Sequence, residues 1–359
     1  MAFYIGLFSI VSLFSYFYTK SKTIDGDVLL IVLVFLVMFI PAALRYGIGT
    51  DYFSYVDMFN RINYNYYNIF YRFDPGFIFL SKLVFLLRLD VQWVFIIMSF
   101  FTYLFLIISV KKKYFFLIIP FYFLFFYLQS YNVIRSALVI SIGYFAYNQF
   151  EKKKYFSSIL CLTLALLFHV STLFYLIIFI IARFIHLDKK HFKLLFIPVI
   201  LLGYLSEVFI PIIINKMSVI NVLFLRYEGY LYRLQGNKIN MLIGTIPRIF
   251  IYFMFMLSLK KGKEKISQLT LLIILLFVDV MFMFGYLIMT RILQMLFIVI
   301  AMVLCNIYNS KSKYRKITIM LAICYFFLLF LNDLRRDRGK NVVPYKMIEN
   351  IEWMYPQNI

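Results

Sequence analysis

The sequence has too few charged residues to cover the surface of a soluble protein of its length. Of 359 residues only 15% are charged, whereas 64% are hydrophobic and 21% are aromatic. A soluble chain of this length would form several domains and would need far more polar surface. The composition therefore excludes soluble domains and indicates a membrane protein.

The motifs of several common enzyme classes are also absent. The sequence contains no glycine-rich phosphate loop, no HExxH, no GxSxG and no Cys/His cluster. The cysteines Cys161, Cys305 and Cys324 lie inside apolar runs without metal or redox spacing, so we expect no disulfide. Asp51 and Asp57 have no further acids nearby, and we predict neither a metal nor a cofactor.

Long apolar runs recur along the sequence with little space between them. Each run is close to the ~20 residues that a helix needs to cross ~30 Å of hydrocarbon. Because every backbone amide needs an internal partner in lipid, only helices or a closed barrel can span it, and these runs lack the alternation of barrel strands. The sequence therefore predicts an all-α polytopic integral membrane protein, with a single transmembrane domain over residues 1–359.

Lysine clusters between the apolar runs predict the orientation of the helices. The formal net charge is +21, from 37 Lys and Arg against 16 Asp and Glu. In a soluble protein this charge would suggest nucleic acid, but here the lysines mark cytoplasmic loops, so we expect no nucleic-acid partner. Crossing out and back between clusters requires about twelve transmembrane helices (roughly 11 to 14), with both termini outside. The expected helices cover residues 2–19, 27–44, 92–110, 114–129, 133–150, 155–168, 170–186, 193–214, 241–259, 267–288, 292–309 and 316–332.

Two long loops are expected to face outward, at residues 45–90 and 215–240. The apolar segment Phe77–Leu89 in the first loop is short and carries two basic residues, so we expect a re-entrant or interfacial helix that begins near Asp74. If this segment crosses the membrane instead, the helix count rises by one and the N-terminus moves inside. Both loops are rich in tyrosine, which suits stacking on sugar rings but is also common at membrane interfaces.

The stretch from Pro41 to Phe59 marks the change from an apolar run to a polar, tyrosine-rich loop. Gly47 and Gly49 free the backbone for a tight turn directly after Arg45. Charged and aromatic residues crowd here, as expected of chemistry at the mouth of a membrane cavity. The alternative interpretation is a snorkelling arginine followed by an ordinary loop.

Several arginines lie at the expected outer ends of helices, against the usual bias of positive charge toward the cytoplasm. Converging guanidinium groups would bind an anion with several oxygens, such as a lipid diphosphate, because the planar fork matches phosphate and stays charged when buried. Taken singly, each arginine is more often a snorkelling residue at a helix end, and it is the shared side and the repetition that favour an anion site. The set comprises Arg45, Arg135, Arg248 and Arg291, with Arg226 added from the second loop.

His169 lies between two apolar runs, at the tip of a short expected hairpin on the same outer side. It could accept a proton from a hydroxyl or steady a phosphate, although such a histidine is more often structural. Asn132 precedes Arg135 at helical spacing, so the amide and the guanidinium should share one helix face.

Four short motifs stand in order along the chain: RYGIGTDYFSYVDMF at 45–59, DPGF at 74–77, NVIRSA at 132–137 and FHVST at 168–172. Together they resemble the EpsG-like branch of the Wzy polymerases, which build O-antigen, capsule and exopolysaccharide. The similarity covers roughly residues 27–180 by motif and the whole chain by architecture. It departs at the serine after Arg135, where many relatives carry glutamine, and beyond residue 180 we recognise only scattered arginines.

The resemblance implies a metal-independent glycosyltransferase with a GT-C-like fold in the bacterial cytoplasmic (inner) membrane, its site facing the periplasm. Such an enzyme transfers a glycan from undecaprenyl diphosphate to a sugar hydroxyl of the next lipid-linked unit, and works in the bilayer alongside a flippase and a chain-length regulator. The residues that we assign to this reaction are Arg45, Arg135, Arg248 and Arg291 for the leaving diphosphate; His169 and Asp51 for orienting or deprotonating the hydroxyl; and Tyr52, Tyr55, Asn132, Arg226 and Tyr230 for the glycan.

Two other functions are compatible with the sequence. A flippase for the same lipid-linked oligosaccharide would also need a basic cavity, but we find no internal repeat, and the polar residues gather on one side. A sugar O-acyltransferase could use the same arginine and histidine chemistry, but its donor would be cytoplasmic. Asp279, an acid inside an apolar run, could pair with Arg248 or Arg291 or could serve proton-coupled transport.

Overall fold

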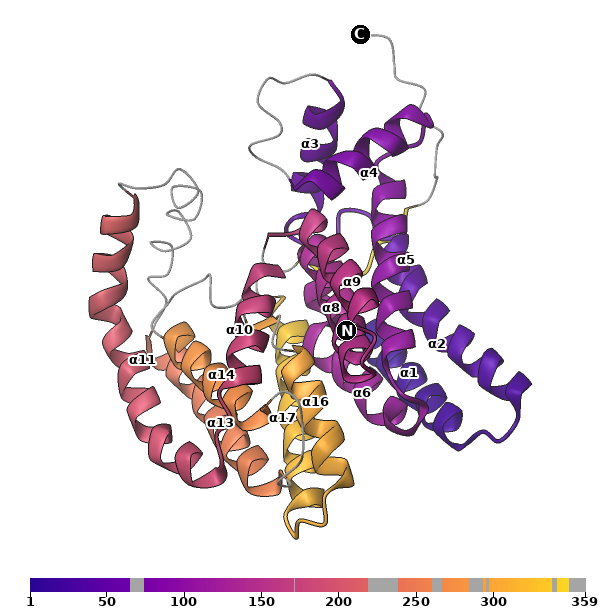
Figure 1. Ribbon diagram of the computed structural model, residues 1–359. Helices are drawn as coiled ribbons and strands as arrows, with labels where there is room; N and C mark the ends of the chain where they lie inside the picture. The colour runs from indigo at the N-terminus through magenta and orange to yellow at the C-terminus, as the bar shows by residue number, and fades with distance from the viewer. Residues whose placement is uncertain are drawn as a thin grey trace. The chain divides into compact units, whose positions relative to one another are not determined.

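The computed structural model describes residues 1–64, 74–170, 172–218, 238–259, 267–283, 293–294, 297–337 and 341–348. Over these residues the chain is helical and contains no β-strand, as the sequence predicts (Figure 1). The chain divides into two compact units. Unit 1 comprises Met1–Leu173 and Phe326–Ile359, and unit 2 comprises Phe174–Tyr325.

Unit 1 contains the helices of the first half of the chain. They are α1 (Ala2–Lys20), α2 (Ile24–Ala43), α3 (Tyr52–Asn63), α4 (Pro75–Leu86), α5 (Gln92–Ser109), α6 (Phe115–Tyr122), α7 (Leu128–Asn132), α8 (Ile134–Glu151) and α9 (Tyr155–Phe168). The π-helical turn η3 (Phe123–Tyr127) joins α6 and α7 into one continuous element, and the 3-10 turn η2 (Lys112–Tyr114) directly precedes α6.

The helices of the second half belong mainly to unit 2. They are α10 (Thr172–Phe184), α11 (Lys189–Ser218), α13 (Lys238–Ser258), α14 (Gln268–Met283) and α16 (Phe297–Asn309). The last helix, α17 (Arg315–Arg336), begins in unit 2 and ends in unit 1. In the described parts, the helices therefore occur where the apolar runs predict them, although α11, with 30 residues, is longer than expected.

Five of the described helices are long and apolar enough to cross a membrane. They are Ala2–Lys20, Ile24–Ala43, Gln92–Ser109, Lys112–Asn132 and Arg315–Arg335. Shorter apolar helices accompany them, among them α4, α9 and α16. These helices confirm a membrane-embedded, all-α protein; the total of about twelve spans stays a prediction.

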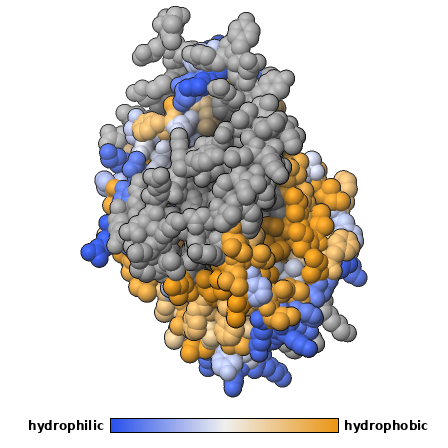
Figure 2. Space-filling model, turned by 90° about the vertical axis from the view of Figure 1, so that its left-hand side faces the viewer, coloured by the Kyte–Doolittle hydropathy of each residue, from blue (hydrophilic) through white to orange (hydrophobic). Residues whose placement is uncertain are grey.

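Large hydrophobic side chains are exposed along many helices, among them Leu13 on α1, Leu29 on α2 and Leu194 on α11. Figure 2 shows one face on which hydrophobic residues form a broad field, bordered by hydrophilic residues at its lower edge. In water such a field would favour aggregation, whereas in a bilayer the lipid chains cover it at no cost. The exposed surface thus agrees with the composition.

The core of unit 1 is built around α8, which packs against both α5 and α9. Small buried residues on α8, such as Ser136, Ala137 and Ser141, let the neighbouring helices approach closely. Beside it, aromatic rings fill the interior, with Phe123 stacked on Tyr127 at a centroid distance of 4.2 Å. Because lipid gives helices no hydrophobic reason to associate, this close packing holds the unit together.

The expected first outer loop contains two short helices, α3 and α4. Asp74 precedes α4 with extended backbone, and Pro75 takes the first helical position, where its fixed φ suits a helix start. With 12 residues α4 is too short to cross the hydrocarbon at ~1.5 Å per residue. Its length agrees with the re-entrant or interfacial helix predicted near Asp74.

Candidate functional site

The turn after Arg45 requires glycine at two positions. Gly47 and Gly49 have φ values of +63° and +96°, which L-residues with a side chain rarely adopt. A Cβ at Gly49 would also lie 2.8 Å from Asn132 Oδ1 and 2.9 Å from the Tyr131 carbonyl oxygen. The backbone of this loop therefore lies directly on the end of α7, and the turn predicted from the two glycines is confirmed.

Asn132 fixes the same loop by a hydrogen bond. The Thr50 N–H donates to Asn132 Oδ1 over 2.8 Å. The amide proposed from the sequence as a glycan ligand thus already has a partner in the loop. Asp51, at the start of α3, accepts from the Thr50 hydroxyl at 3.2 Å and is partly exposed, so its carboxylate remains accessible.

The guanidinium of Arg45 turns inward and is only 1% exposed. It donates to the carbonyl oxygens of Ala42 and, over 3.1 Å, of Tyr131. It also lies between two aromatic rings, 5.0 Å from the centroid of Phe95 and 4.9 Å from that of Tyr131. No carboxylate among the described residues lies within ion-pair distance of it.

Burial lowers the pKa of Arg45 from its ordinary value, because a low-dielectric environment disfavours the charged form. The ordinary value is so high that the guanidinium stays protonated. Arg45 therefore holds a positive charge inside unit 1 that carbonyl dipoles and ring faces stabilise without neutralising it. In this conformation it contacts no external ligand.

The end of α2 needs four hydrogen-bond donors, because the last carbonyl groups of a helix have no partners within it. Each of the carbonyls after Ile40 receives a donor from elsewhere in unit 1. The pairs are Tyr345 Oη to the Pro41 oxygen (3.0 Å), the Arg45 guanidinium to Ala42, Gln92 Nε2 to Ala43 (2.5 Å) and the Ile348 N–H to Leu44 (2.9 Å). Arg45 thus caps its own helix, where a cation also favours the helix dipole.

Gln92, the first residue of α5, connects this helix end to α3. Its Oε1 accepts from the Tyr52 hydroxyl over 3.0 Å, while its Nε2 donates to Ala43. Tyr52 in turn stacks on Phe95 at 4.6 Å with nearly parallel rings. Tyr52 is buried, so in this conformation it positions α3 and does not reach a glycan. Sequence reasoning missed Gln92; the signal was an amide opening an apolar helix.

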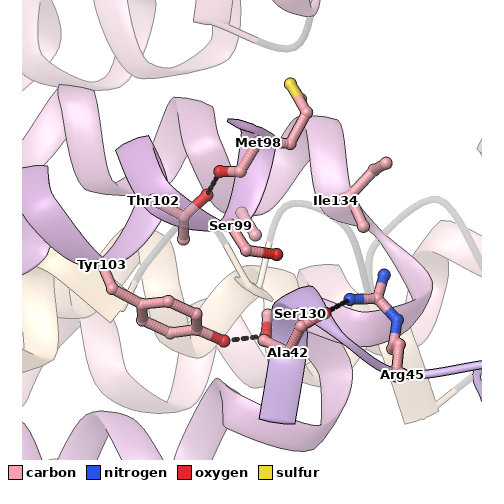
Figure 3. A pocket seen from close by; sticks show the side chains of 9 residues that line it. Ala42, Arg45, Met98, Ser99, Thr102, Tyr103, Ser130 and Ile134 are labelled. Atoms are coloured by element: carbon pink, nitrogen blue, oxygen red, sulfur yellow. Dashed lines mark hydrogen bonds between the residues drawn. The ribbon is translucent and has the colours of Figure 1, made fainter. Parts of the chain in front are cut away.

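A small cavity of about 10 Å³ lies beside Arg45. Figure 3 shows the side chains that line it. Its polar lining includes Ser99, Thr102 and Tyr103, with Tyr103 Oη 3.1 Å from Ser130 Oγ. A cavity of this size holds about one water molecule. It is far too small for a sugar or a diphosphate, so this cavity by itself is not a substrate site.

Arg135 and Asp74 form an ion pair at 2.6 Å between the start of α8 and the start of α4. Their side chains are 12% and 10% exposed, so the ion pair is mostly buried but part of it is still accessible to solvent. The guanidinium lies 5.7 Å from the ring centroid of Tyr55 and 5.4 Å from that of Phe77. The sequence prediction named Arg135 and Tyr55 but missed Asp74, for which the DPGF motif was the available signal.

His169 follows α9 directly and lies near this ion pair in the fold. A Cβ on Gly76 would lie 2.9 Å from the Leu167 carbonyl oxygen and 3.2 Å from the Phe168 ring. The start of α4 therefore packs directly against the end of α9. His169 is buried, and its own carbonyl accepts from Thr172 Oγ1 over 2.8 Å. The structure therefore brings His169 to the same end of unit 1 as Asp74 and Arg135.

Unit 2 holds a second arginine whose side chain points inward, with 16% of it exposed. Arg248 Nη1 lies 3.0 Å from Asp279 Oδ1, and Tyr252 donates its hydroxyl to Asp279 Oδ2. Asp279 is completely buried, so the expectation that it faces Arg248 is confirmed. The alternative partner, Arg291, lies outside the described residues. Arg226 and Tyr230 of the expected second loop also lie outside them.

A family model described as the EpsG family matches residues 28–347. The chain belongs to the EpsG family. The matched residues include every candidate site residue discussed above and lie in both units. No curated protein and no solved structure matches the chain.

EpsG-family membership agrees with the resemblance drawn from the four motifs, and it indicates a membrane protein of polysaccharide biosynthesis. Each motif contacts another one in unit 1. Thr50 bonds to Asn132 and Arg135 pairs with Asp74, while a Cβ on Gly76 would lie 3.2 Å from the Phe168 ring. The arrangement offers a partly exposed guanidinium beside the rings of Tyr55 and Phe77, which suits the binding of an anionic sugar-linked lipid.

Proposed function

We propose that this EpsG-family protein polymerises lipid-linked oligosaccharide repeat units on the outer side of the bacterial inner membrane. One observation carries the proposal: four motifs that are far apart in the sequence meet at one end of unit 1. A purely structural role would not require an arginine, a histidine and two acids, Asp51 and Asp74, at the same place. An enzyme acting on an anionic lipid would.

The reaction moves the glycan between two lipid-linked molecules. The bond between the anomeric carbon and the diphosphate oxygen breaks, and a bond forms to a hydroxyl oxygen of the acceptor unit. The hydroxyl proton passes to a base, and undecaprenyl diphosphate leaves with the electron pair. Because negative charge develops on the diphosphate, positive groups held in place lower the barrier most.

Arg135 is the arginine best placed to contact the diphosphate. It lies at the start of α8, partly exposed, and Asp74 holds its side chain in place. An incoming diphosphate can compete with the single carboxylate because it offers more oxygens to the guanidinium fork. Arg45 contributes its buried charge from behind the loop, and Arg248 and Arg291 are further proposed ligands.

His169 or Asp51 orients or deprotonates the attacking hydroxyl. A positioned base accounts for about a hundredfold to ten-thousandfold in rate, and holding both sugars in place can contribute more. Tyr55 lines the approach to Arg135, and Arg226, Tyr230 and the amide of Asn132 are the other proposed glycan contacts. We propose no metal in this step; a flippase that delivers the units and a chain-length regulator complete the pathway.

A gene-deletion strain tests the proposal. We expect gel analysis of its surface polysaccharide to show loss of long chains, with a single repeat unit still exported, because flipping is intact. Absence of that single unit from the surface would instead support the flippase. Retention of long polymer that lacks only an acyl substituent would support the acyltransferase.

Variants of the ion pair localise the site in the same strain. We expect Arg135→Ala to abolish long chains and Arg135→Lys to fail as well, because lysine offers a point charge without the fork. The matched control is Arg335→Ala, since Arg335 is exposed near the end of α17. A normal polymer ladder from Arg135→Ala, at wild-type protein level, would remove Arg135 from the site.

A further inference from the structure

The C-terminal segment Asn341–Ile348 runs antiparallel beside the loop that carries Arg45. Three backbone hydrogen bonds join them: Tyr46 N–H to the Lys346 oxygen (3.0 Å), Ile348 N–H to Leu44 (2.9 Å) and Gly49 N–H to Asn341 (3.1 Å). Arg45 and Met347 form the one isolated β-bridge of the described chain. Residues about three hundred positions apart therefore fix each other's backbone.

Tyr345 anchors this segment to the membrane-spanning helices. Its hydroxyl donates to the Pro41 oxygen over 3.0 Å, and its ring stacks on Phe3 of α1 at 4.3 Å. Burial raises the pKa of Tyr345 to about 12, so the hydroxyl keeps its proton throughout the neutral range. Val342, fully buried, holds the other end of the segment, where its N–H donates to Asp337 Oδ1 over 3.0 Å.

The segment supplies two of the four donors that the end of α2 needs. Tyr345 and Ile348 satisfy the carbonyls of Pro41 and Leu44, while Arg45 and Gln92 satisfy the two between them. The carbonyls bound by Tyr345 and Ile348 therefore lie on either side of the Ala42 carbonyl that the Arg45 guanidinium caps. Loss of an outer donor leaves a buried carbonyl unsatisfied, and the helix end must shift to find water.

We infer that the segment Asn341–Ile348 is a positioning element of the candidate site, with Tyr345 as its principal positioning residue. The inference rests on the proposed polymerase function. Tyr345 does not contact substrate; it fixes the end of α2, and through it the Arg45 side chain and the glycine turn. A displacement of about 1 Å at a reacting group can cost about a hundredfold in rate, so small shifts here are measurable.

Two matched pairs of variants test the inference in the full-length protein, reconstituted in liposomes with a lipid-linked repeat unit. Tyr345→Phe removes the hydroxyl donor and keeps the ring on Phe3, and its control is Tyr16→Phe, on an exposed position of α1. Ile348→Pro removes the N–H donor, and its control is Ile348→Ala, which keeps that N–H.

We expect Tyr345→Phe and Ile348→Pro to lower kcat by about tenfold or more, with KM for the repeat unit nearly unchanged and only a modest fall in the Tm of the protein. Hydrogen exchange provides a readout that is independent of activity: the amides of Tyr46 and Gly49 should exchange faster in both variants than in their controls. Wild-type kcat in both variants, or a loss of kcat that follows the amount of folded protein, would overturn the inference.

The two proposals fail in different ways. Wild-type protein that polymerises nothing, while exchange at Tyr46 and Gly49 still responds to the variants, would count against the polymerase alone. Active wild-type protein whose loop exchanges equally in all variants would count against the positioning role alone.

Discussion

Arg45 in unit 1 is buried and Arg248 in unit 2 is 16% exposed, and the charges of these two arginines are stabilised in different ways. Arg248 has a carboxylate partner, Asp279, which also accepts from Tyr252. Arg45 has carbonyl oxygens and ring faces instead, with no described carboxylate in ion-pair range. A paired charge contributes little field beyond its site, whereas an unneutralised charge remains available to attract an anion.

The same difference determines what each arginine does for stability. Removing one partner of a buried pair leaves an uncompensated charge, while removing both can be nearly neutral. Arg45 has no partner to remove with it, and its loss uncaps α2 directly. Substitutions at the two arginines should therefore separate function from stability.

Replacement of Arg45 should have the largest effect on activity. We expect Arg45→Ala to abolish polymer, a loss of at least about a hundredfold to a thousandfold if the charge stabilises the departing diphosphate. Arg45→Lys should also fail, because an ammonium is a compact point charge without the planar fork that reaches the Ala42 and Tyr131 oxygens while its faces lie against two rings. Polymer gels normalised to the amount of inserted protein measure this. A wild-type ladder from Arg45→Lys would show that charge without geometry is enough.

Replacement of Asp279 should have the largest effect on stability. Asp279→Leu leaves Arg248 buried without its counter-charge, which costs about 3–5 kcal/mol. The double variant Arg248→Met/Asp279→Leu should recover most of the Tm in detergent. If Arg248 also binds the diphosphate, the double variant will be stable yet inactive. A stable and active double variant would limit Arg248 to a structural role.

A smaller loss of stability is expected from a substitution in the turn after Arg45. Gly49→Ala combines a strained φ of +96° with contacts below 3.0 Å to Asn132 and Tyr131, so we expect about 1–3 kcal/mol of destabilisation. Gly6→Ala in α1 is the matched control, because a Cβ there meets nothing within 4 Å and alanine favours a helix. Equal Tm values for the two variants would show that the turn can relax.

The sequence predicted those features that depend on local composition. Apolar runs indicated the helices, the two glycines indicated the turn, and an intramembrane acid implied a basic partner such as Arg248. It did not predict the inward direction of Arg45. That direction follows from the unpaired carbonyls of α2 and from the rings of Phe95 and Tyr131, which reach Arg45 only through the fold.

The same reason explains the residues that sequence reasoning missed. Gln92, Asp74 and Tyr345 act through partners between about 40 and 300 positions away, and no local pattern marks such pairs. Asp74 belonged to a recognised motif but was interpreted only as the start of a helix. A polar residue at the edge of an apolar run is a good candidate for a hydrogen-bond donor to a neighbouring helix end, because the last carbonyls of that helix need donors.

A substitution at Tyr52 should have the smallest effect in the comparison of the Arg45 and Arg248 regions, because the Tyr52 hydroxyl supports the Arg45 region only through Gln92. Tyr52→Phe keeps the stacking on Phe95 and removes one buried hydrogen bond. We therefore expect the free energy of unfolding to fall by about 0.5–1.5 kcal/mol, which a lower Tm would report. Because Tyr52 is buried, the KM for the lipid-linked unit should not change. A raised KM with an unchanged Tm would mean that the ring turns outward to hold the glycan, as the sequence first suggested. The Arg45 region would then rearrange when substrate binds, because Tyr52 would leave its hydrogen bond to Gln92.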